Sequence, residues 1–76
     1  MAQLRKISGK DCVKLLCNKF GFFIARQSGS HVVLKKEYLG ETFGTVVPLH
    51  KELKLGTLKS ILELAGISEE EFSNEQ

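Results

Sequence analysis

A glycine, a serine and a histidine stand together at residues 29–31, between two runs of apolar residues that favour strands. Histidine changes its charge near neutral pH, so His31 is the side chain of this chain best suited to move protons. Gly29 and Ser30 let the backbone come close to a ligand, and their N–H groups can approach an anion such as a phosphate. A plain turn with a histidine that bonds only locally explains the same tripeptide. Acid–base chemistry at His31 and an ordinary turn are therefore both open.

Basic side chains near this tripeptide are the candidates for holding an anionic ligand. Side chains alternate along a strand, so Lys35 is expected on the face of His31. Lys36 and Arg26 are expected on the other face, although Arg26 adjoins the turn and a long side chain there can still reach round. Each single lysine is equally explained as a solvated surface charge. The candidates for contact with an anion are Arg26, Lys35, Lys36, Lys51 and Lys54.

One further histidine and two cysteines complete the residues that could do chemistry. His50 could pair with His31 as acid and base, but nothing in the sequence brings the two together, and bracing a basic connector is the alternative. Cys12 and Cys17 are five apart in a predicted helix, so their side chains diverge by about 140° and do not easily bridge. No cysteine and histidine spacing matches a metal site. We expect reduced thiols in a cytoplasmic protein, with no metal and no small-molecule cofactor.

Capping patterns and periodicity predict the elements that position these side chains. Ser8 followed by Asp11 predicts a helix start, and Gly21 ends that helix. Ser68 followed by Glu71 is a second such pattern and predicts a last turn before a frayed end. The predicted elements are a helix over 9–20, strands over 22–27, 31–37 and 45–47, a helix over 56–65, a turn at 28–30 and a loop at 38–44. This order predicts an α+β fold, α-β-β-β-α, with a three-stranded antiparallel sheet and two helices packed on one of its faces.

The other face of the sheet is expected to stay open. If Gln27 pairs with His31, the residues sharing the face of His31 are Phe23, Ala25, Val33 and Lys35. The more apolar set, expected to meet the helices, is then Phe22, Ile24, Val32 and Leu34. Exposed apolar side chains such as Phe23 and Val33 indicate a partner surface. Packing under the 38–44 loop or under a terminal flap is the alternative.

Length and charge limit what the chain can be. Seventy-six residues make one small domain, which buries only about 60% of its unfolded surface and has no room for a cofactor domain. The net charge is +2, and every Lys and Arg lies at or before Lys59. Without four glutamates near the C-terminus, eleven positive and five negative charges remain, a net +6. Such a surface suits a phosphate-bearing partner. No apolar run is long enough for a signal peptide or a membrane span.

A set of short motifs resembles the HicA-type toxin family over about residues 4–67. The matching residues are Gly21-Phe22, Arg26, Gly29-Ser30-His31, Val47-Pro48, His50, Glu52-Leu53, Gly56-Thr57-Leu58 and Ile61-Leu62. The resemblance implies a single toxin domain over 4–67 with a fold similar to double-stranded-RNA-binding domains, followed by a short acidic turn or tail over 68–76. It also implies an mRNA interferase held inactive by a HicB-type antitoxin. The family's catalytic histidine falls on His31.

RNA chemistry fits this assignment, because the 2′-hydroxyl of RNA is itself the nucleophile. Cleavage then needs a base near that hydroxyl, positive charge at the phosphate and an acid at the leaving oxygen. One histidine with some basic residues can supply these without a metal. The expected partners are mRNA and a HicB-type antitoxin that covers the open sheet face together with His31, and no membrane. Two rivals remain, a non-catalytic module that binds double-stranded RNA by its shape and a module that only docks another protein.

Overall fold

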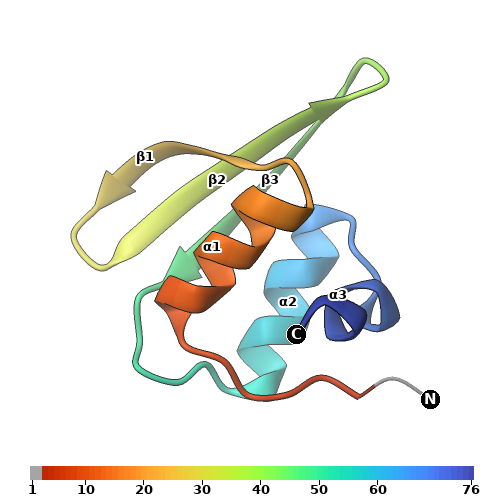
Figure 1. The fold of residues 1–76 in the computed structure, drawn as a ribbon. Coiled ribbons are helices and arrows are strands. Elements are labelled where there is room, and N and C mark those ends of the chain that lie inside the picture. The colour runs from red at the N-terminus through yellow and green to blue at the C-terminus, as the bar shows by residue number, and fades with distance from the viewer. Residues whose placement is uncertain (1–2) are drawn as a thin grey trace.

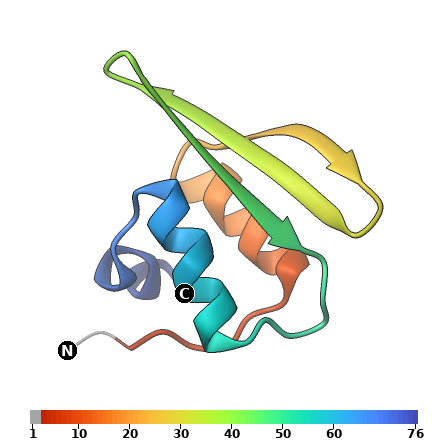
Figure 2. The ribbon, with the colours of Figure 1, turned by 180° about the vertical axis from the view of Figure 1, so that it is seen from behind.

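The computed structural model describes residues 3–76 and has one sheet and three helices. Its elements are α1 (Gly9–Lys19), β1 (Phe23–Ser28), β2 (His31–Tyr38), β3 (Glu41–Pro48), α2 (Leu55–Ala65) and α3 (Glu69–Glu75). The strands form an antiparallel sheet in the order β1-β2-β3. All three helices lie on one side of it, as the two opposite views show (Figures 1 and 2). The predicted class and the predicted order of elements are confirmed, and the second face of the sheet is open.

The first helix is fixed at its start by a side-chain cap and by the end of β3. The Ser8 hydroxyl accepts a hydrogen bond from the Asp11 N–H (3.0 Å), as predicted. The Gly9 N–H donates to the His50 carbonyl (2.9 Å). A Cβ at Gly9 would lie 2.0 Å from the Pro48 carbonyl oxygen, so only glycine allows this close approach. The start of α1 is therefore attached to the chain that leaves the sheet.

The core fills the space between the sheet and the helices. Its fully buried side chains include Leu16 of α1, Leu34 and Val47 of the sheet, and Leu58 of α2. Thr45, the buried polar residue of β3, donates from its hydroxyl to the Ile61 carbonyl of α2 (2.9 Å). The hydrogen bond removes the cost of burying that hydroxyl and ties the central core to α2.

Both cysteine thiols are free. Cys12 is fully buried, and this burial raises the pKa of its thiol to about 12. Partial burial also raises the pKa of the Cys17 thiol. A raised pKa reduces the fraction of thiolate, which is the reactive form of cysteine. Both side chains therefore serve packing in this fold.

The acidic end of the chain is a helix that contributes to the core, and the predicted fraying is wrong. Ser68 and Glu71 form the predicted capping box, with bonds of 3.0 and 3.1 Å between each backbone N–H and the other side chain. The bond from the Ser68 N–H is the main reason why the pKa of Glu71 is lowered. Phe72 is completely buried, and its ring stacks on that of Phe20 with centroids 6.0 Å apart. The buried ring of Phe72 thus holds α3 against the rest of the domain.

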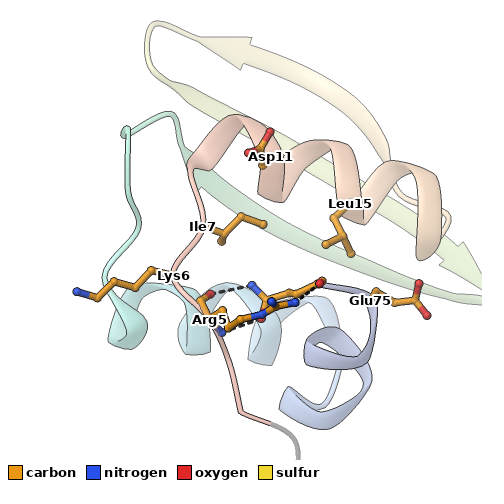
Figure 3. Close-up of a pocket in the computed structure, with 7 residues that line it drawn as sticks. Arg5, Lys6, Ile7, Asp11, Leu15 and Glu75 are labelled. Carbon is orange, nitrogen blue, oxygen red and sulfur yellow. Dashed lines mark hydrogen bonds between the residues drawn. The ribbon is translucent and has the colours of Figure 1, made fainter.

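The last residue holds α3 against the segment that precedes α1. The Gln76 side-chain amide pairs with the Arg5 backbone in both directions, at 2.8 and 2.7 Å, and the Arg5 guanidinium donates to the Gln76 carbonyl (Figure 3). A pocket of about 350 Å³ lies beside these bonds, lined also by Asp11 and Leu15 of α1 and by Glu75 of α3 (Figure 3). No strand residue lines it, so this hollow belongs to the helical layer.

The predicted loop over 38–44 is wrong, because β2 and β3 form one long hairpin. Residues 39 and 40 are its whole turn, and both have positive φ (51° and 80°), as in a type I′ turn. A leucine is rare in that conformation, so the turn has no recognisable signature in the sequence. Gly44 then lies inside β3, opposite Lys35.

Candidate catalytic site on the open sheet face

His31 is the first residue of the middle strand. Its Cα lies opposite Ser28 of β1 and Pro48 of β3, so the ladders on both sides fix its backbone. The Leu49 N–H donates to the Ser30 carbonyl (2.6 Å), which attaches the turn to the end of β3. The His31 side chain is exposed. The His31 imidazole is therefore carried by a backbone that is paired on both sides, and it remains accessible to a ligand.

The turn before His31 has two residues instead of the expected three. Ser28 belongs to β1 and pairs with His31, which leaves Gly29 and Ser30 as the connection. Of these two, only Gly29 has a positive φ (58°), as in a type II′ turn. A Cβ at Gly29 would have nothing within 4 Å, so the backbone conformation, and not close packing, favours glycine here. Without a side chain, Gly29 also leaves the surface of the turn uncovered.

A β-bulge at Ala25 decides which side chains of β1 accompany His31. Beyond the bulge, Phe23 pairs with Lys35 as the expected register requires. Between the bulge and the turn, the pairing is shifted by one residue, so the expected pairing of Gln27 with His31 is wrong. Arg26 lies opposite Val33, on the face of His31, and its expected place on the face of Lys36 is also wrong. Bulges commonly re-aim a side chain in this way next to functional sites.

Two cations and a shallow depression accompany His31 on the open face. Lys35 follows His31 by four residues on the same strand and therefore shares its face, about 13 Å away at the usual rise. Arg26, Lys35, Ala25 and Val33 line a depression of about 260 Å³. The structure thus brings together five of the predicted site residues, which are Arg26, Gly29, Ser30, His31 and Lys35.

The other three predicted anion contacts lie elsewhere. Lys36 is on the helix side of the sheet, and its ammonium lies 5.7 Å from the centre of the Phe22 ring and 5.4 Å from that of Tyr38. Lys51 and Lys54 are exposed in the connector between β3 and α2, which runs away from the sheet along the helical layer (Figure 1). Lys54 is the N-cap residue of α2.

His50 lies closer to the site than its position in the sequence indicates. It follows Pro48, the partner of His31, by two residues, and its carbonyl accepts the hydrogen bond from Gly9. Its side chain is exposed. The backbone contact supports the predicted bracing of the connector and is independent of the imidazole.

Ile24 departs from its expected place in the core. It faces the helix side opposite Leu34, yet it is 53% exposed because a groove separates it from α1. Lys10, Val13 and Lys14 of α1 face Ile24 and Gln27 of β1 across a groove of about 390 Å³. This groove lies on the opposite side of the sheet from His31.

Negative charge is concentrated away from the turn. The glutamates of α3 lie in the helical layer, at the opposite end of the molecule from the β1–β2 turn (Figures 1 and 2). Within residues 3–76, no three His, Cys, Asp or Glu side chains are grouped so that they could hold a metal ion. None of the helices described is long and apolar enough to cross a bilayer.

Comparison with known proteins connects this geometry to a family. The family model of the HicA toxin of bacterial toxin–antitoxin systems matches residues 9–67, which include α1, the three strands, the Gly29-Ser30 turn, His31 and α2. Searches of curated proteins and of solved structures found no match. Because the family model covers most of the chain and the fold has the predicted order of elements, the chain belongs to the HicA toxin family.

Proposed function

We propose that this toxin is an mRNA interferase, an endoribonuclease that cuts single-stranded mRNA with His31 as the proton-transfer residue. One observation carries the proposal. The exposed imidazole of His31 stands on the middle strand of the sheet and shares an open face with Arg26 and Lys35. The imidazole can carry one of the two proton transfers of RNA cleavage through the 2′-hydroxyl, the cations supply positive charge, and water can carry the other proton transfer.

Each group has a distinct task in this reaction. The His31 imidazole takes the proton of the 2′-hydroxyl or gives one to the leaving 5′-oxygen, a contribution of typically about 10²–10⁴ in rate. The Arg26 guanidinium, opposite Val33 and so closer to His31 than Lys35 is, offsets the charge that develops on the phosphate. The Lys35 ammonium binds the RNA backbone further along β2. The N–H groups of Gly29 and Ser30 lie at the turn, outside the strand ladder, where no side chain obstructs a phosphate. None of these steps needs a metal ion. Lys51 and Lys54 add long-range attraction for the RNA backbone.

The same face is the proposed contact for a HicB-type antitoxin. Phe23 and Val46 are exposed there, 52% and 42% respectively, beside the basic side chains. A partner that covered these apolar side chains would also cover His31. Inhibition would then be steric, because bound antitoxin and bound RNA need the same surface.

We predict that cleavage depends on the ribose and not on a divalent cation. The purified protein should cut single-stranded RNA in excess chelator and leave a 2′,3′-cyclic phosphate, since the 2′-hydroxyl attacks the phosphate. An RNA with a single 2′-deoxyribose at the cleaved position should resist cutting there. Mass spectrometry of the products measures both effects. Undiminished cutting at the deoxyribose would contradict the mechanism, and duplex binding without any cleavage would favour the non-catalytic alternative.

Lys35 and Lys36 are neighbours on opposite faces and provide a matched pair. Lys35→Ala should weaken RNA binding and reduce the slope of log affinity against log salt by about 1, since one phosphate contact is lost. Lys36→Ala should leave RNA binding unchanged and instead lower stability by about 0.5–1 kcal/mol, because the contact of its ammonium with two rings is lost. Salt titrations by fluorescence anisotropy and thermal unfolding measure the two effects. If both variants lost the same RNA affinity, the face of the sheet on which a lysine lies would not decide whether it contacts RNA.

A further inference from the structure

Phe23 is an aromatic ring exposed on the face of His31. It lies opposite Lys35 in the β1–β2 ladder, and its neighbour Phe22 points into the core. Phe23 itself is 52% exposed. Solvating half of a phenyl ring is unfavourable, and nothing within the described chain covers it. The fold therefore presents a flat apolar surface next to a cation.

Gly44 of β3 adds no side chain to the open face on the other side of Lys35. It lies opposite Lys35 in β3, so Phe23, Lys35 and Gly44 form one row across the three strands. The φ of Gly44 is not in the left-handed region, and a Cβ there would meet only ordinary contacts, the nearest being the Leu34 carbonyl oxygen at 3.8 Å. Neither the backbone nor the packing requires glycine. A glycine inside a strand often marks a place where a ligand comes close.

The charges around this row fit a nucleic acid. Arg26 and Lys35 line a depression on the same face as Phe23. Lys35 lies in the row of Phe23, and Arg26 lies between that row and the His31 end of the face. The carboxylate on this face of β2 belongs to Glu37, one row further toward the hairpin tip. A phosphate chain that runs from Lys35 toward His31 therefore meets cations and avoids the acid.

We propose that the row Phe23–Lys35–Gly44 is a base-binding subsite for single-stranded RNA. An unpaired base stacks on the Phe23 ring and occupies the space over Gly44, while its phosphate lies near Lys35. The inference rests on the proposed ribonuclease function and adds to it a fixed position at which one base of the RNA is bound. Since Lys35 is about 13 Å from His31 along β2, the stacked base lies a few nucleotides from the cleaved bond. The subsite sets the register of the strand at His31 and excludes paired RNA, whose bases are already stacked.

Binding measurements on a variant that does not cut RNA test the subsite. In a His31→Ala background, Phe23→Leu should weaken binding of a short single-stranded oligoribonucleotide about tenfold, because stacking of one base is lost. Phe23→Tyr should retain the affinity, since it keeps the ring. Tyr38→Leu is the matched control, because Tyr38 is 58% exposed and lies on the other face, and it should leave RNA affinity unchanged. An abasic site placed at each position in turn should weaken binding strongly at one position only, and that loss should disappear in Phe23→Leu.

Gly44→Val tests whether a side chain that fills the subsite weakens RNA binding without destabilising the fold. Its side chain has room in the free protein, so the thermal midpoint should stay the same or rise, while RNA affinity falls about tenfold because the base is displaced. Unchanged RNA affinity in both Phe23→Leu and Gly44→Val would overturn the subsite, and loss of antitoxin binding alone would assign the row to that partner. A parent protein that binds RNA through Phe23 but does not cut it would refute the ribonuclease function and leave the subsite standing.

Discussion

Replacing His31 by alanine should abolish cleavage of single-stranded RNA, with a loss in rate of about 10²–10⁴-fold. His31 carries the one imidazole on the three strands described, and the other charged side chains on its face are those of Arg26, Lys35 and Glu37. The fold should be unaffected, because the imidazole is exposed and the backbone is held by two strand ladders and the bond from Leu49 to Ser30. Initial rates on a labelled RNA, together with the thermal midpoint of the variant, measure the two expectations.

The matched control is His50→Ala, which removes the other exposed imidazole close to the turn. The structural contact of His50 runs through its carbonyl, and alanine keeps it. Cleavage should therefore stay within a few-fold of the parent. His31→Ala should still bind RNA, because Arg26 and Lys35 remain, and expression of this variant should no longer arrest growth. Full cleavage by His31→Ala would refute the proposed mechanism.

The fold could be predicted from the sequence because its signals are local. Ser8 with Asp11 and Ser68 with Glu71 mark helix starts within four residues of chain, and Gly21 and Gly66 stand at the positive-φ positions where the two longer helices end. Alternating apolar residues around a short turn indicate a hairpin in the same way. These patterns, together with the requirement to bury one face of the sheet, are enough to predict the order of elements.

The details that shape the site depend on contacts over longer distances. No local pattern marks the bulge at Ala25, yet the bulge moves Arg26 to the face of His31. The turn at Leu39 contains a residue that seldom adopts positive φ, so β3 was expected to begin too late and Gly44 was assigned to a loop. The row of Phe23, Lys35 and Gly44 could be recognised only after both registers were known. His31 and Lys35 were predictable together because they lie on one uninterrupted strand.

Phe72→Ala should destabilise the domain by about 3–5 kcal/mol. The ring is completely buried, stacks on Phe20 and holds α3 on the domain, so its removal leaves a cavity and frees the helix. A domain of this size is expected near the low end of the usual range of about 5–15 kcal/mol, so this loss removes most of its stability and the variant should be partly unfolded at physiological temperature. Urea denaturation followed by circular dichroism measures the loss. Leu64→Ala is the control, because Leu64 is also a large apolar residue but is 61% exposed on α2, and its effect should stay within about 0.5 kcal/mol. Equal small effects would show that the toxin domain ends near Ile67, whereas the expected difference makes α3 part of the folding unit that supports the sheet and His31.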